Sequence, residues 1–379
     1  MRCGCRYASG HWHLLALQWR RLILDRVFQG ICSLRRYTAD AERRSGRHAG
    51  SPVFNRQYSR RECIPLTTPD LIETRVLKGG TLAKRLRAEI SAAKIRLSEL
   101  DGRAPVLATL LVGEDAPALA YRASIERTFR KVEIEHRHIE LPATTSNVEL
   151  VAAVEQLNNT REITGILVLM PLPDHLDPHL ILEHLSPLKD VDGITPTNAG
   201  RLHLGLPSLR PSTPAGGLEL LDFFNVELEG ARVTVIGRSN VVGRPMATLL
   251  TQRHATVTLC HRRTVDLAGE VRHADVVCIA AGSPGLVTAA MVKPGAIVLD
   301  FGVNVSDVGT IVGDADYDGL LGIAGAITPV PGGTGPVTAL VLARNTLAAG
   351  FAALQGSLND VLFDLPERLK PAQDAHAPE

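Results

Sequence analysis

A strand, a tight turn and the start of a helix follow one another in the stretch Thr234–Leu250, TVIGRSNVVGRPMATLL. The β-branched residues up to Ile236 predict a buried strand, and the run from Met246 predicts a helix. This order aims backbone N–H groups and the positive end of a helix at the turn, which favours an anion there. Dinucleotide-binding folds hold pyrophosphate in this way, but the usual G-x-G-x-x-G pattern is reduced here to Gly237 and Gly243. The turn does not by itself identify a cofactor.

Strands and helices alternate along most of the chain, which at 379 residues is long enough for two domains. A Pro/Gly-rich break at Arg210–Gly217 divides the pattern. Before it we expect helices near 80–100, 121–132, 147–157 and 178–185, and strands beginning at Pro105, Glu135 and Gly165. After it we expect a helix to Phe224 and strands beginning at Val233, Ala255, Ala274 and Ala296. Such alternation implies βαβ units and parallel sheets.

The predicted fold class is therefore α/β, with two domains and a cleft between them. The first, residues 71–214, is a βαβ parallel-sheet domain completed by a C-terminal helix at 336–355. The second, residues 215–335, is a Rossmann-type doubly wound domain. Residues 1–70 form a basic head and residues 356–379 a tail, both outside the two domains.

Charge is distributed unevenly along the chain. Residues 1–62 carry 13 Arg, no Lys and 4 acids, so the head is near +9 and the rest of the chain near −8. A net acidic body argues against nucleic acid as the main partner, because phosphate binding needs a basic face. No apolar run approaches the 18 or more residues that cross a bilayer, so no membrane partner is expected.

The head resembles a mitochondrial transit peptide. It has no acid before Asp25, and Arg alternates with Leu, Ile and Val at roughly helical spacing. The run LRRYTA at Leu34–Ala39 also resembles a mitochondrial processing site. These features predict a matrix protein whose mature chain begins near or after Thr38. Two alternatives stay open: a start codon assigned too far upstream, with a cytoplasmic protein, and a disordered basic arm.

The six cysteines do not have the spacing of a zinc site or a disulfide framework. We therefore expect no metal, and buried, reduced cysteines in an intracellular protein. Four lie in or beside the head and two in strand-like runs: Cys3, Cys5, Cys32, Cys63, Cys260 and Cys278.

The strand after the turn ends in a basic run, CHRRT at Cys260–Thr264. In doubly wound folds the adenine ribose lies at this strand end, where an acid favours NAD and basic groups favour the 2′-phosphate of NADP. Arg262 and Arg263 stand here with no acid, and Arg238 lies on the turn. NADP is therefore the predicted cofactor. A solvated surface patch is the alternative, more for Arg263 than for Arg262.

Four segments together resemble the bifunctional methylenetetrahydrofolate dehydrogenase/methenyltetrahydrofolate cyclohydrolase family. They are YRASI at Tyr121, KDVDGITPTNAGRL at Lys189, GRSNVVGRP at Gly237 and ITPVPGGTGPVT at Ile327. The resemblance covers roughly residues 75–355. It implies an enzyme of one-carbon metabolism that oxidises 5,10-methylenetetrahydrofolate with NADP, binds tetrahydrofolate derivatives and forms a homodimer.

The resemblance also implies roles for single residues. Asp192 would hydrogen-bond the pterin, and Tyr121 would stack near the reacting carbon, so both are candidate catalytic and substrate-binding residues. From the residues alone, Asp192 would be a turn residue before Gly193 and Tyr121 an ordinary core residue. The loop Pro329–Gly333 would line the folate cleft, because glycines let backbone approach a flat ring closely. The implied contacts of this loop are Pro331, Gly332 and Gly333, and the cofactor-binding residues are Gly237, Arg238, Ser239, Arg262 and Val303.

Three positions depart from the family pattern. The family has Y-x-x-x-K, with the lysine one helical turn beyond the tyrosine and on the same face, but this chain has Ile125 there. Leu169 replaces a glutamine that helps to position and tune that lysine, and Ser212 replaces the cysteine of PCTP, a change that should be tolerated. Nearby Arg122 and Arg127 lie on other helix faces and stay protonated, so neither is a natural substitute for the lysine.

Two hypotheses follow from these departures. Isoleucine cannot donate, accept or carry charge, so the cyclohydrolase step, which depends most on the lysine, is expected to be weak or lost. Dehydrogenation is less affected, since hydride transfer rests on positioning. The first hypothesis is an NADP-linked folate dehydrogenase, and the alternative is a non-catalytic folate- and NADP-binding paralogue that pairs with an active subunit.

Overall fold

The computed structural model describes residues 72–306 and 309–360. The predicted head and most of the predicted tail lie outside these residues, so the expectations about targeting and about four of the six cysteines lie outside them too. The other two cysteines, Cys260 and Cys278, are free and buried, as expected.

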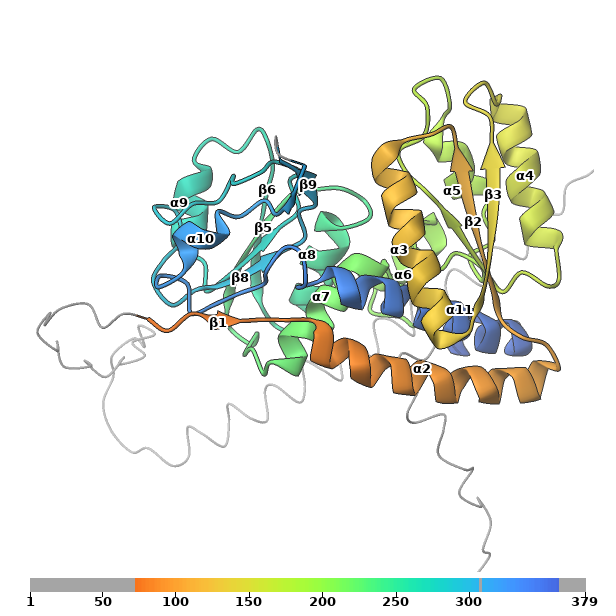
Figure 1. The fold of residues 1–379 in the computed structure, drawn as a ribbon, viewed down its shortest axis with the longest axis horizontal. Coiled ribbons are helices and arrows are strands. Elements are labelled where there is room, and N and C mark those ends of the chain that lie inside the picture. Colours follow the sequence, from red (N-terminus) through yellow and green to blue (C-terminus); the bar gives the residue numbers. More distant parts are fainter. Residues whose placement is uncertain (1–71, 307–308, 361–379) are drawn as a thin grey trace, which may run out of the picture. The chain divides into compact units, whose positions relative to one another are not determined.

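The first sheet has three parallel strands in the order β3-β2-β4 (Figure 1). They are β2 (Val106–Val112), β3 (Glu135–Leu141) and β4 (Gly165–Val168). Every residue of β2 is buried, as a central strand covered on both faces requires. The connecting helices are α3 (Ala116–Val132), α4 (Asn147–Asn159) and α5 (Pro178–His184).

The helices of this half begin at recognisable caps. The Asp115 carboxylate accepts a hydrogen bond from the Ala118 N–H at the start of α3, and a proline occupies the first turn. At α4, Ser146 and Glu149 form a reciprocal capping box. The cap at Asp115 explains why α3 begins five residues before the predicted start at Tyr121.

The second sheet has six parallel strands in the order β1-β11-β8-β7-β5-β6. The strands are β1 (Arg75–Val76), β5 (Arg232–Ile236), β6 (Thr256–Cys260), β7 (Val276–Ile279), β8 (Ile297–Asp300) and β11 (Ala326–Ile327). From β5 the chain first adds β6 on one side and then β7 and β8 on the other. The order therefore reverses between β5 and β7, which makes a topological switch point. Because β1 pairs with β11, the first residues of the predicted first domain join the second sheet.

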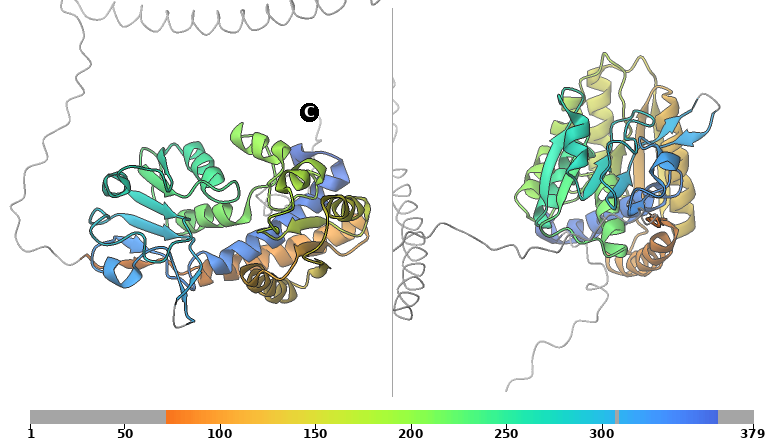
Figure 2. Two further views of the ribbon diagram at one scale, coloured as in Figure 1. Left: turned by 90° about the horizontal axis from the view of Figure 1, so that it is seen from above. Right: turned by 90° about the vertical axis from the view of Figure 1, so that its left-hand side faces the viewer.

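Three helices connect the two sheets. They are α2 (Gly80–Asp101), α7 (Ser212–Phe223) and α11 (Gly335–Gln355). Figures 1 and 2 show α2 and α11 running side by side, and α11 also packs against α3 and α7. One apolar cluster reaches from Leu107 in β2 through these helices to Val235 in β5 and Leu299 in β8. The C-terminal helix was predicted to complete the first domain, and in the structure it packs between both sheets.

The remaining elements are short. The helix α6 was not predicted, because its sequence PTNAGRLH contains Pro, Asn and Gly, which are typical of loops. In the structure the Thr195 side chain caps this helix. These elements are α6 (Pro196–His203), α8 (Gly243–Gln252), α9 (Leu267–Arg272), β9 (Asn304–Val305), β10 (Ile311–Val312), α10 (Tyr317–Leu320) and η1 (Leu358–Asp360).

Within the described part of the chain, one helix is long and apolar enough to cross a bilayer. This helix is α11, whose most apolar 18-residue window has a mean hydropathy of 1.5. Its sequence is not an unbroken apolar run, because Thr338 and the run Arg344–Thr346 interrupt it, so the sequence pattern did not indicate a segment apolar enough to cross a bilayer. In the fold, 89% of that window is buried inside the protein, as in the core helix of a globular domain.

Candidate functional site

The turn between β5 and α8 is closed by glycines that no other residue could replace without strain. Gly237 has φ +117°, and a Cβ there would lie 2.1 Å from the carbonyl oxygen of Ala280 at the end of β7. A Cβ on Gly243 would lie 1.9 Å from the carbonyl oxygen of Gly237. These glycines therefore let the turn fold tightly over the end of β5 and against β7.

Ser239 stabilises the turn from within. Its Oγ accepts hydrogen bonds from the N–H groups of Val242 (3.1 Å) and Gly243 (3.4 Å), at the start of α8. The hydroxyl hydrogen of Ser239 remains available for a ligand, and the side chain is exposed. The predicted cofactor residue thus also shapes the anion-binding turn.

The other predicted cofactor residues follow the C-terminal ends of neighbouring parallel strands. Arg238 follows β5, Arg262 follows β6 and Val303 follows β8. All three side chains are exposed, with Val303 at 73%. Because parallel strands end at one edge of their sheet, these residues share the edge with the glycine turn. The fold therefore provides a tight backbone cradle with exposed guanidinium groups beside it, and these features fit a dinucleotide with a 2′-phosphate.

The loop Pro329–Gly333 leaves the same edge after β11 and ends at α11. The Gly333 N–H donates to the Pro329 carbonyl at 2.7 Å, and the Gly332 carbonyl accepts from the Gly79 N–H at 3.0 Å. Gly332 has φ +109°, and both Pro331 and Gly332 are exposed while Gly333 is buried. The loop thus joins the second sheet to α2 and α11.

Tyr121, Ser212 and Asp192 come together from three different elements. The Asp192 Oδ1 accepts hydrogen bonds from the Ser212 N–H (3.0 Å) and from the Ser212 Oγ (2.9 Å) at the start of α7. The side chain of Ser212 also interacts with the Tyr121 hydroxyl on α3. Ser212 therefore donates its hydroxyl hydrogen to Asp192 and also interacts with the Tyr121 hydroxyl, so the three side chains form one polar group. Sequence reasoning treated Ser212 only as a tolerated change.

Two buried side chains fix the backbone that carries this group. The Asp190 carboxylate accepts from the Thr195 N–H (2.9 Å), the Thr195 hydroxyl (2.7 Å) and the Asn198 amide (2.9 Å). Asn345 of α11 donates through Nδ2 to the carbonyls of Val191 and Arg210, each at 2.8 Å. Those two carbonyls precede Asp192 and Ser212 closely in the chain, so Asn345 joins the two segments. Asn345 lies 154 residues from Val191 in the sequence, so no local motif could have revealed this contact.

Burial sets the protonation of this group. It raises the pKa of Asp192 to about 6, against the opposing effect of the two Ser212 hydrogen bonds. It also raises the pKa of Tyr121, with the negative charge of Asp192 adding to the effect. The Tyr121 phenol is therefore neutral at physiological pH. The Asp192 carboxyl, with its pKa of about 6, titrates close to physiological pH.

The two residues that replace the family lysine and glutamine lie in the apolar core. Ile125 on α3 has no exposed surface, and Leu169, directly after β4, is 2% exposed. Both belong to the cluster that contains Leu107 and Phe129. The sequence departures thus correspond to an apolar patch one helical turn beyond Tyr121.

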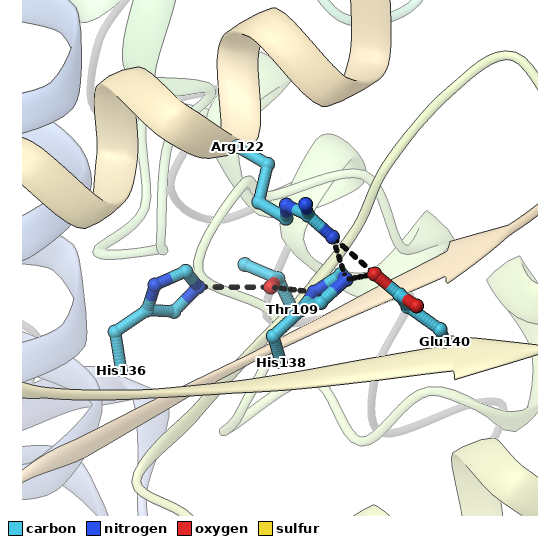
Figure 3. Close-up of polar contacts among 5 residues, drawn as sticks. All are labelled: Thr109, Arg122, His136, His138 and Glu140. Carbon is cyan, nitrogen blue, oxygen red and sulfur yellow. Dashed lines mark hydrogen bonds and ion pairs between the residues drawn. The ribbon is translucent and has the colours of Figure 1, made fainter. Parts of the chain in front are cut away.

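Arg122 is committed to a separate polar network and does not take the place of the lysine (Figure 3). Its guanidinium contacts His138 and Glu140 on β3. The Thr109 hydroxyl in β2 joins His136 (2.8 Å) to His138 (3.0 Å). Burial, with the neighbouring His138, lowers the pKa of His136. The sequence prediction that Arg122 faces another direction is confirmed.

Comparison with known proteins decides the family. Residues 77–192 match the model of the tetrahydrofolate dehydrogenase/cyclohydrolase catalytic domain, and residues 211–353 match the model of its NAD(P)-binding domain. The bifunctional protein FolD of Chloroflexus aurantiacus is 49% identical over 278 residues, which are 73% of this chain and 98% of that protein. This chain belongs to the tetrahydrofolate dehydrogenase/cyclohydrolase family.

Solved structures of the family have the same fold. The bifunctional FolD enzyme of Campylobacter jejuni is 40% identical, with a TM-score of 0.70, over 73% of this chain and 98% of its own. The methylenetetrahydrofolate dehydrogenase-cyclohydrolase (FolD) of Trypanosoma brucei, in complex with NADP and an inhibitor, is 35% identical. Its TM-score is 0.71 over 75% of this chain and 99% of its own. The predicted resemblance and the two-domain α/β fold of the family are confirmed.

Proposed function

We propose that this family member oxidises 5,10-methylenetetrahydrofolate to 5,10-methenyltetrahydrofolate with NADP. The observation that carries the proposal is the cradle of Gly237 and Gly243 with exposed Arg238 and Arg262 at one sheet edge. NADP, when bound, accepts a hydride. The sequence similarity to bifunctional FolD proteins supports the folate substrate.

The residues of this chain supply positioning for that step. As the hydride leaves the methylene carbon, the lone pair of the adjacent nitrogen fills the electron demand, so no proton has to be exchanged. Asp192 accepts N–H groups of the pterin, and Tyr121 packs beside the reacting carbon, which keeps water from it. The backbone of Gly332 and Gly333 borders the ring. The step therefore needs geometry rather than an acid or a base.

Hydrolysis of the methenyl product has a different requirement, and we propose that it is weak or lost. Water must give up one proton as its oxygen bonds to the carbon. As the C–N bond then breaks, the ring nitrogen gains a proton and the hydroxyl on the carbon loses one to become the formyl C=O, so one proton is released overall. At the position of the family lysine, Ile125 can take no part in any of these transfers. The polar group of Tyr121, Ser212 and Asp192 is a proton-bearing group that the fold brings together here.

The alternative, a binding paralogue that pairs with an active subunit, is favoured by one observation. Ile125 and Leu169 both pack in one apolar cluster, so the replacement of the family lysine and glutamine leaves no unpaired polar group there. A coupled assay on methylenetetrahydrofolate with NADP separates these functions. NADPH formation without conversion of added methenyltetrahydrofolate above the buffer rate supports a dehydrogenase. Tight binding of both ligands without NADPH formation would instead establish the paralogue.

The cofactor preference gives the first prediction. Arg238→Ala and Arg262→Ala should each weaken NADP binding, because a charge-assisted hydrogen bond to a phosphate is worth roughly 1.5 to 3 kcal/mol. NAD, which lacks the 2′-phosphate, should bind almost as before. Titration of both cofactors on both variants measures this, with Arg263→Ala as the control. Equal losses for NAD and NADP would show that the arginines contact the pyrophosphate or support the fold.

The pKa of Asp192 gives the second prediction. Its ionised form accepts N–H groups, and its pKa is raised to about 6, so the binding-competent fraction falls as the pH drops through that value. The KM for the folate substrate should therefore rise about tenfold for each pH unit below about 6, while the KM for NADP changes less. Asp192→Asn should raise the folate KM at pH 8 and flatten its pH dependence. The same slope in the variant would assign the titration to another group.

We also propose that the protein is a homodimer. The strand β3 forms an edge of the first sheet, with seven residues and a mixture of Glu, His and Arg side chains. An unpaired edge of this length presents a row of N–H and C=O groups that a second copy can pair. Light scattering should give twice the chain mass, and a monomer at micromolar concentration would contradict the proposal.

A further inference from the structure

Two loops border the switch point where a dinucleotide of this fold binds. One is the glycine turn Gly237–Gly243 after β5, and the other is the loop Ala281–Ser283 after β7. The two strands are adjacent and parallel, and the Ala280 N–H continues their ladder to the Ile236 carbonyl at 2.7 Å. Ligands in open α/β sheets lie in the crevice at such a point. The second loop is therefore a wall of the cofactor crevice.

The backbone of this wall is folded around the carboxylate of Asp314. The Asp314 Oδ2 accepts from the N–H groups of Ala281 (2.7 Å) and Gly282 (2.9 Å), and Oδ1 accepts from the N–H of Ser283 (2.8 Å). Gly282 has φ +63°, which turns successive N–H groups toward one point. Such a concave run of amides is an anion-binding nest. Here a side chain of the protein fills it.

The same carboxylate supports the loop after β8. The Asn304 Nδ2 donates to Asp314 Oδ1 at 2.8 Å. A Cβ on Gly302 would lie 2.4 Å from the Asp314 Cγ, so the backbone beside Val303 passes directly over the carboxylate. Asp314 has no exposed surface, and four N–H donors occupy the four acceptor positions of its two oxygens. One buried anion thus holds the loops after both β7 and β8.

We propose that Asp314 is a positioning residue for the cofactor, which sets the shape of the nicotinamide side of the crevice without touching the ligand. The inference rests on the proposed NADP-dependent function. Its distinctive consequence is that NADP and NAD depend on Asp314 equally, because it supports loops and does not read the 2′-phosphate. Folate binding uses Asp192 and the Pro329–Gly333 loop, and neither is hydrogen-bonded to Asp314 in the described structure, so it should change much less than cofactor binding.

Asp314→Asn tests the proposal with little change in volume. Each Asp314 oxygen accepts from two donors, so the NH2 group of an asparagine would face two N–H donors in either orientation of its amide. These donors would lose their acceptor, and the nest must open. The dissociation constants of NADP and NAD should both rise at least about tenfold, while the folate KM stays within twofold. Amide hydrogen exchange at Ala281–Ser283 should accelerate. Asp316→Asn is the matched control, because this nearby exposed residue only caps α10 and should change none of these quantities.

The possible outcomes separate the proposals. A folded Asp314→Asn protein that binds both dinucleotides within twofold of wild type overturns the positioning role and leaves the proposed function intact. A wild-type protein that binds no NADP overturns the proposed function itself. If Asp314→Asn does not fold, Asn304→Ala removes one of the four donors, and it should weaken both cofactors about threefold with faster exchange at Ala281–Ser283. Unchanged affinity and exchange in that variant contradict the proposal.

Discussion

Ile125→Lys combined with Leu169→Gln should raise cyclohydrolase turnover by about 10² to 10⁴ over wild type, the usual contribution of one positioned acid–base group. The lysine would stand one helical turn beyond Tyr121, as in the family pattern, and the glutamine would give its ammonium a hydrogen-bond partner. The dehydrogenase rate should change less, because that step exchanges no proton. Hydrolysis of methenyltetrahydrofolate, followed by its absorbance, measures the gain.

The single variant Ile125→Lys is the control for this design. The side chain at 125 has no exposed surface, and an unpaired charge buried there costs several kcal/mol. The lone lysine should therefore shed its proton or turn aside, lower the free energy of unfolding and give less activity than the pair. Robust cyclohydrolase activity in wild type, abolished by Tyr121→Phe or Asp192→Ala, would show that another group already performs the lysine's role.

Gly237→Ala should abolish measurable NADP binding. The new methyl carbon would lie 2.1 Å from the Ala280 carbonyl oxygen, and φ +117° is a conformation that alanine adopts only with strain. The turn must then move away from β7, which disturbs the backbone cradle that the turn forms. Calorimetric titration with NADP measures the loss, and chemical denaturation measures a destabilisation of about 1 to 3 kcal/mol.

Gly230→Ala is the matched control for that variant. Gly230 also has a positive φ, +73°, in the turn before β5, but a Cβ there has nothing within 4 Å. It should lower the free energy of unfolding by about 1 kcal/mol from backbone strain alone and leave NADP affinity unchanged. If Gly237→Ala bound NADP as well as Gly230→Ala does, the close approach to Ala280 would not be what shapes the crevice.

The fold was predictable where one segment carries its own signal. The strands β2, β5, β6, β7 and β8 are apolar or β-branched runs, and each was expected within a few residues. The strands β1, β9, β10 and β11 have two residues each, too few for any periodicity, and they exist through their pairing partners. The early start of α3 was signalled by Asp115 and the proline after Ala116, and could have been found.

The site was predictable where its chemistry lies in a contiguous motif. The glycine turn with Arg238 is such a motif, and so is the basic end of β6. Ser212 became informative only when the fold placed it 2.9 Å from the Asp192 carboxylate, across 20 residues of sequence. Asn345 and Asp314 are further examples, because a buried polar residue shows its role only through the backbone groups that it contacts.

The helix α11 limits how far this protein can be treated as two modules. Sixteen consecutive residues, Val337–Ala352, are buried, and the helix packs against α2, α3 and α7. A cut at the predicted boundary near residue 215 would give each fragment an open apolar surface, because a helix buried all round needs partners on every side. The two halves therefore cannot be exchanged independently. A chimaera built from two family members has to take α2, α7 and α11 from the same parent protein.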